Sequence, residues 1–116
     1  KELSLVVLVC FLRMNMKKIA IDFEFCSATF KLFCVAINDG VETKGWWLQD
    51  PAQRTDFINW FNDNKGVLWL AHFYEIAEAK CLEKLGIDTT TINVFDTGYF
   101  GFIMNDKYIN TSILQL

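Results

Sequence analysis

The sequence predicts one α/β domain in which helices pack on a mixed β-sheet. Three observations indicate this class: β-rich runs come first, a turn signal at Asp39 and Gly40 joins two of them, and later apolar runs alternate with helical patterns. A tight turn makes the early strands antiparallel, whereas helical crossovers make the later strands parallel. The 116 residues, 53% of them hydrophobic, suffice for one buried core.

The first half of the chain predicts three antiparallel strands and a helix. The strands are expected at residues 17–25, 30–38 and 41–48. Asp50 is the expected N-cap of the helix, because Pro51 suits its first position and the apolar residues of 57–61 form one broad face. The helix is expected to end near Asn64.

The second half predicts two further strands, each followed by a helix. In chain order these elements are a strand at 66–73, a helix at 74–86, a strand at 92–97 and a helix at 98–105. The first of these strands is continuously apolar, which is typical of a central strand covered on both faces. Gly86 is the expected C-cap of its helix, and Asp96 or Thr97 is the expected N-cap of the last helix.

The two ends of the chain lie outside this pattern. Residues 3–12 are an apolar run shorter than the roughly 20 residues that cross a bilayer, and no signal-peptide cleavage motif follows it. We therefore expect translation to begin at Met14 or Met16, which makes residues 1–15 a dispensable extension and 16–116 the domain. An extra strand or helix packed on the domain is the alternative. The chain stops in mid-pattern, which predicts a C-terminally truncated domain.

Composition excludes several function classes. The net charge of −3 gives no global basic field, so nucleic-acid binding would depend on a local site and on metal ions. The cysteines lack the spacing of a zinc site or a disulfide scaffold, which favours reduced thiols in the cytoplasm. The lone His72 has no Ser or Cys partner at triad spacing, so a packing or helix-start role is expected. Trp46 and Trp47 are candidates for stacking on bases, since Trp60 and Trp69 lie on faces predicted to be buried.

Two carboxylates stand in a strand that otherwise has a buried pattern. Asp22 and Glu24 share one face of the strand IAIDFEF, because side chains alternate along a strand. Burying an unpaired carboxylate is costly, so this pair predicts a divalent-cation site with the oxygen ligands that Mg²⁺ and Mn²⁺ prefer. A solvated strand face is the alternative, and the apolar flanks favour a strand covered on both sides instead.

The corner between the strand at 66–73 and the helix after it supplies further candidates. Ligands commonly bind at such corners of α/β sheets, and this one carries His72, Glu75 and Glu78. The two glutamates are three positions apart and are expected to share one helix face, so either could approach a metal ion. An exposed helical glutamate without a ligand is the alternative for each.

Taken in order, the stretches IDFEF, AHFYEIAEA and VFDT resemble the motifs of the DEDD superfamily of 3′–5′ exonucleases. The likeness spans residues 17–104 and is greatest to the proofreading exonuclease domains of phage-type family A DNA polymerases. It implies a ribonuclease H-like fold and metal-dependent hydrolysis of terminal phosphodiester bonds of DNA during replication. The implied partners are the 3′ end of single-stranded DNA, with RNA as the open alternative, and a polymerase domain in the same full-length chain. No membrane contact is implied.

The resemblance also implies a ligand set for two Mg²⁺ or Mn²⁺ ions about 3.5–4 Å apart. Asp22 would bridge both ions, Glu24 would hold the ion that carries the attacking water, and Glu78 would hold the second ion. Glu78 is preferred to Glu75 because its neighbours, AEAKCL, resemble the phage-type pattern.

The chain departs from the family pattern at three places. Phe73 replaces the usual Asn after the histidine, Asp96 is interpreted as an N-cap and not as a ligand, and the family's last motif has no counterpart before Leu116. We therefore expect the fragment to lack exonuclease activity and the protein extended through its natural C-terminus to have it. The alternative function is a catalytically dead ribonuclease H-like module that serves as a structural or binding domain of a larger replication protein.

Overall fold

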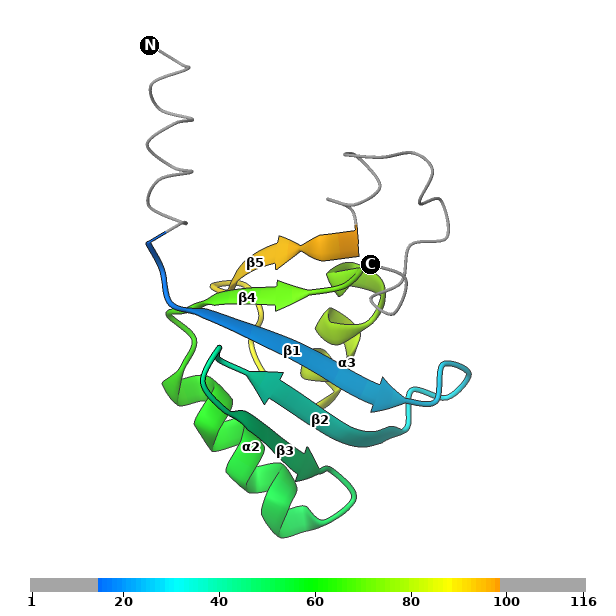
Figure 1. Ribbon diagram of the computed structural model, residues 1–116. Helices are drawn as coiled ribbons and strands as arrows, with labels where there is room; N and C mark the ends of the chain where they lie inside the picture. The colour runs from blue at the N-terminus through cyan, green and yellow to red at the C-terminus, as the bar shows by residue number, and fades with distance from the viewer. Residues whose placement is uncertain (1–14, 99–116) are drawn as a thin grey trace.

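Five strands in the order β3-β2-β1-β4-β5 make one open, mixed sheet (Figure 1). The computed structural model describes residues 15–98. The strands are β1 (Lys18–Phe25), β2 (Leu32–Asn38), β3 (Thr43–Trp47), β4 (Leu68–Ala71) and β5 (Asn93–Asp96). The helical elements are α2 (Pro51–Asp63), the 3-10 helix η1 (Tyr74–Ile76) and α3 (Glu78–Lys84). The predictions for the N-terminal extension and for the helix at 98–105 fall outside the described residues.

The central strand β1 joins the two halves of the sheet. It pairs antiparallel with β2, which pairs antiparallel with β3, and it pairs parallel with β4, which pairs parallel with β5. The predicted mixed sheet is therefore confirmed. Because β1, β4 and β5 run in one direction, their carboxyl ends meet at the same edge, where α/β proteins commonly bind ligands (Figure 1).

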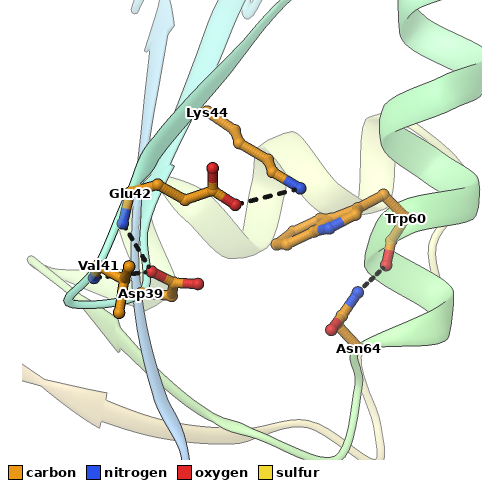
Figure 2. A network of polar contacts seen from close by, with 6 residues as sticks. All are labelled: Asp39, Val41, Glu42, Lys44, Trp60 and Asn64. Atoms are coloured by element: carbon orange, nitrogen blue, oxygen red, sulfur yellow. Dashed lines mark hydrogen bonds and ion pairs between the residues drawn. The ribbon is translucent and has the colours of Figure 1, made fainter.

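Local polar contacts close the turn before β3 and the C-terminal end of α2 (Figure 2). The Asp39 carboxylate accepts hydrogen bonds from the N–H groups of Val41 (2.9 Å) and Glu42 (3.0 Å), which closes the predicted turn between β2 and β3. At the end of α2 the Asn64 amide donates to the carbonyl of Trp60 at 2.7 Å. These contacts are local in sequence, which is why the turn and the helix end were predictable.

Helix α2 begins and ends close to the predicted residues. The Asp50 carboxylate accepts from the Ala52 N–H at 3.1 Å, and Pro51 is the first helical residue, so the predicted N-cap is confirmed. The helix places Phe57 and Phe61 in the core with no exposed surface. No helix within residues 15–98 is long and apolar enough to cross a membrane.

Aromatic rings fill the space between α2 and the sheet. Phe61 stacks on Trp69 with ring centroids 4.5 Å apart, and Phe57 meets Phe23 edge-on at 5.8 Å and Trp46 at 5.1 Å. Burial of such a side chain stabilises a fold by about 1.5–3 kcal/mol, and edge-on or offset ring pairs add to this. This aromatic cluster therefore fixes α2 against the sheet through rings from β1, β3 and β4.

The prediction that β1 is covered on both sides is wrong. Ile19, Ile21 and Phe23 face the core and are at most 4% exposed, whereas Ala20, Asp22 and Glu24 lie on an exposed face. The alternation of apolar and polar residues in IDFEF describes one covered face, and the flanking apolar residues belong to that same face. The two predicted ligands of β1 are thus accessible from solvent.

The segment after β4 also differs from its prediction. The strand ends at Ala71, and one predicted helix is replaced by η1 and the seven-residue α3. Ala77, with φ −128° and ψ −84°, separates these two elements. Glu75 and Glu78 therefore do not share a helix face. The helix then ends at the C-cap Leu85, one residue before the left-handed Gly86.

Replacing Tyr74 with Phe should raise the free energy of unfolding by about 1 kcal/mol. Tyr74 is 8% exposed, and its hydroxyl has no hydrogen-bond partner among the described residues. Folding therefore strips this group of water without a replacement, and its removal relieves that cost. Urea denaturation of both proteins measures the change, with Tyr74→Ala as the control that loses packing. A less stable Tyr74→Phe variant would contradict the prediction.

Candidate active site

The predicted carboxylates of β1 lie beyond the part of that strand that pairs with β4. The parallel register ends at Ala20, which is opposite Leu70, so Asp22 and Glu24 follow on a part of β1 that extends past this pairing. Neighbouring atoms shield the Asp22 carboxylate from water and raise its pKa, and the negative charge of Glu24 raises it further. His72 lowers the pKa of Asp22 and so lies within electrostatic reach of it.

Glu78 is the buried acid of the site, with 3% of its surface exposed. Its carboxylate accepts a hydrogen bond from the backbone N–H of Phe23. That N–H lies on the edge of β1 that faces β4, because the Lys17 carbonyl on the same edge accepts from the Leu68 N–H at 2.8 Å. The pairing with β4 stops at Ala20, so no residue of β4 is opposite Phe23 and this edge of β1 is open there. The Glu78 carboxylate takes the place of a strand carbonyl as the acceptor for the Phe23 N–H.

The pKa of Glu78 is the most displaced among the carboxylates of residues 15–98. Burial raises the pKa of Glu78 to about 8, the negative charges of Asp22 and Asp96 raise it too, and the Phe23 N–H acts in the opposite direction. In the absence of a cation, Glu78 is therefore mostly protonated at neutral pH. A group of this kind at the end of parallel strands is typical of a functional site.

Asp96 holds the corner that follows β4. One of its carboxylate oxygens, Oδ1, accepts from the N–H groups of Phe73 and Gly98, both at 2.9 Å, and Oδ2 accepts from the Tyr74 N–H at 2.7 Å. The Gly98 contact spans two residues, as at an N-cap or in an Asx turn, and the helix that Asp96 was predicted to cap lies outside the described residues. The other two contacts were not predicted. They bend the chain directly after β4 and hold Phe73 in a left-handed conformation, with φ 53°.

Thr97 ties the same corner to β5. Its hydroxyl donates to the Ala71 carbonyl at 3.3 Å and lies 3.4 Å from Nδ1 of His72. The His72 ring packs edge-on against Phe73, with centroids 4.7 Å apart. These contacts agree with the expected packing role of His72. Asp96 and Thr97 thus hold in place the segment between β4 and Glu78.

The structure separates the predicted site residues into two groups. Asp22 influences the pKa of Glu78, and Glu24 influences that of Asp22, so these three acids form one electrostatic cluster. Glu75 is exposed on η1 and does not belong to it. Within residues 15–98 no three His, Cys, Asp or Glu side chains are placed so that they could hold a metal ion. Burial first, and then the negative charges of neighbouring acids, raise the pKa values of Asp22 and Glu78, and a nearby positive charge would lower them.

The tryptophan predictions are only partly correct. Trp46 is not available to stack on a base, because it is 7% exposed and its Nε1 donates to Asp56 at 2.8 Å. Trp47, its neighbour on β3, is 51% exposed and stays a candidate. Trp69 lies in the core as predicted. Neighbouring residues of a strand face opposite sides, so only one of the pair could be available.

No protein-family model and no curated protein matches the sequence. What the site can do therefore follows from its own residues. Cys34 lies opposite Glu24 in the β1–β2 register, and partial burial together with the charges of Glu24 and Asp22 raises the pKa of its thiol. A thiolate nucleophile is disfavoured there. The groups whose pKa values depend on one another at this edge of the sheet are the carboxylates of Asp22, Glu24 and Glu78.

Proposed function

We propose that the chain is part of a ribonuclease H-like 3′–5′ exonuclease domain, and that the full-length protein hydrolyses terminal phosphodiester bonds of DNA with two divalent metal ions, whereas this part alone is inactive. One observation carries this proposal: the buried Glu78 reaches the open edge of β1 beside Asp22, at the carboxyl ends of the parallel strands. The mixed sheet with β1 at its centre and the order of the three sequence motifs support the same function.

The three acids have different tasks in this proposal. When bound, the metal ions would activate a water molecule and stabilise the leaving 3′ oxygen. Asp22 interacts electrostatically with both Glu24 and Glu78, so it would contact both ions. Glu24 would hold one of them from the exposed face of β1. Glu78 would release its proton as it binds the other ion, because nearby positive charge lowers the pKa of a carboxyl group.

Calorimetric titration of the chain with Mn²⁺ tests the metal site. We expect Asp22→Asn to weaken binding by about tenfold or more, since a removed ligand is worth at least that much. Glu42→Gln is the matched control, because Glu42 is an exposed acid on the turn between β2 and β3, where it pairs with Lys44 at 3.7 Å. Proton release from Glu78 should make the measured heat depend on the buffer. Equal affinities for wild type and Asp22→Asn would sink the proposed site.

A nuclease assay tests the reaction itself. The full-length protein should shorten a 5′-labelled oligonucleotide from its 3′ end in the presence of Mg²⁺, and its Asp22→Asn variant should not. A full-length protein that neither binds Mn²⁺ nor cleaves DNA would favour the catalytically dead module. Cleavage that is unaffected by Asp22→Asn would place the active site elsewhere.

A further inference from the structure

A groove of about 530 Å³ lies at the end of the sheet where β1 turns into β2. Its walls come from the start of β2, the segment between β3 and α2, the first turn of α2, and the end of α3. It is lined by Lys31, Leu32, Gln49, Arg54, Lys84 and Leu85. We propose that this groove, called the basic groove below, binds the phosphodiester backbone of a single nucleic-acid strand.

The backbone of the protein holds two of the three cations in place. Lys84 donates from Nζ to the Phe30 carbonyl at 2.8 Å, and Arg54 donates from Nε to the Leu48 carbonyl at 2.8 Å. A carbonyl fixes a charged group without neutralising it. Arg54 therefore keeps its terminal N–H groups for an anion, and guanidinium groups bind phosphate oxygens in pairs.

Among the described residues, those that line the basic groove include no acidic side chain. The ion pair found within residues 15–98 is that of Lys44 with Glu42, on the turn between β2 and β3. Asp50 follows the lining residue Gln49 and is not itself a lining residue; its carboxylate is held at the start of α2, where it accepts from the Ala52 N–H at 3.1 Å and from the Gln53 amide at 3.2 Å. Three positive charges thus gather on a chain whose net charge is −3. Such a local site is what nucleic-acid binding by an acidic protein requires.

The proposed function and the apolar residues beside the cations favour a nucleic-acid strand as the ligand of the basic groove. Leu32 is opposite Phe25 in the β1–β2 register, and Phe25 directly follows Glu24. The groove therefore lies at the carboxyl end of β1, on the core side that Phe25 and Leu32 share, whereas Asp22 and Glu24 lie on the exposed face of the same strand. Its apolar residues, Leu32 and Leu85, suit sugar and base surfaces beside the phosphates. The choice of a nucleic-acid strand as the ligand rests on the proposed function, whereas the expectation that the groove binds phosphate rests on its three cations, Lys31, Arg54 and Lys84.

Fluorescence anisotropy with a labelled single-stranded oligonucleotide in EDTA and low salt tests this inference. We expect Lys31→Glu to weaken binding by about tenfold, because it reverses one charge of the basic groove. The salt dependence of binding should also become shallower, by about 0.7 in logarithmic slope for each phosphate that the variant no longer neutralises. Lys44→Glu is the matched control, since it changes the net charge equally but lies at the other end of β2, opposite Ile37. It should change affinity by less than about twofold.

The outcomes separate this inference from the proposed function. Binding in EDTA needs neither metal ions nor cleavage, so loss of affinity in Lys31→Glu supports the basic groove even if the Mn²⁺ titration fails. Equal losses of oligonucleotide affinity in Lys31→Glu and Lys44→Glu would show that binding depends on net charge alone and would overturn the assignment of the basic groove. Displacement of the oligonucleotide by inorganic phosphate or polyglutamate at comparable anion concentrations would overturn the choice of a nucleic-acid strand. Circular dichroism confirms that both variants are folded.

Discussion

Replacing Asp96 with Ala should lower the free energy of unfolding by about 4 kcal/mol, a large part of the stability of a small domain. The carboxylate accepts hydrogen bonds from three backbone N–H groups, those of Phe73, Tyr74 and Gly98. Hydrogen bonds to a charged acceptor are worth more than neutral ones, and the partly buried donors would be left without a partner. The corner after β4 would lose its restraint, and Glu78 would lose its fixed position.

Urea denaturation followed by circular dichroism measures this loss. Asp96→Asn should give an intermediate value, because the amide oxygen can replace one acceptor while its NH₂ group faces a donor. Asp88→Ala is the control for a local carboxylate, since within residues 15–98 the Asp88 side chain accepts hydrogen bonds from Thr90, two residues later in an exposed loop, and the transition midpoint should hardly move. Wild-type stability in Asp96→Ala would mean that the corner is held by other contacts.

The second large effect concerns pH. In EDTA, the free energy of unfolding of the wild type should decrease as the pH rises from about 5 to about 8. The Glu78→Gln variant should not show this decrease. The folded protein raises the pKa of Glu78 to about 8, chiefly by burial, from its ordinary value of 4.5. Between these values the folded state holds a proton that the unfolded chain has released, so stability decreases by up to about 1.4 kcal/mol per pH unit. Below the ordinary pKa of the carboxyl group both states are protonated, and the stabilisation is fully present.

Glu75→Gln is the matched control for this measurement. Glu75 is three residues earlier but exposed on η1, so its variant should keep the wild-type pH dependence. Adding Mn²⁺ at about pH 8 should restore stability to wild type and not to Glu78→Gln, because a cation favours the ionised carboxylate. Parallel curves for wild type and Glu78→Gln across the whole range would refute the displaced pKa.

Features fixed by neighbouring residues were predictable from the sequence. The N-cap Asp50, the turn at Asp39 and Gly40, and the first three strands all follow from local propensities and alternation. The shared face of Asp22 and Glu24 is likewise a property of any extended strand. For this reason the alternation of residues alone is enough to place the two carboxylates of β1 side by side.

Features that depend on distant residues were not predictable in the same way. The pattern of residues 74–86 favours one helix, but Asp96, more than twenty residues later, binds the N–H groups of Phe73 and Tyr74 and bends the chain. The burial of Glu78 follows from that bend and from the early end of β4. Apolar flanks alone also cannot tell whether one or both faces of β1 are covered, because that depends on where the helices pack.

The pairing of β1 with β4 has a consequence for the order in which the chain folds. Short connections join β1 to its neighbour β2 and β2 to its neighbour β3, whereas the pairing of Lys18 with Leu68 brings together residues that are fifty positions apart. Closing the longer loop costs more chain entropy, and such long-range pairing slows folding. We expect the antiparallel meander to form first and β4 to dock afterwards. Glu78 would then meet Asp22 only in the last step, so that partly folded chains would carry Asp22 and Glu24 but no buried third acid.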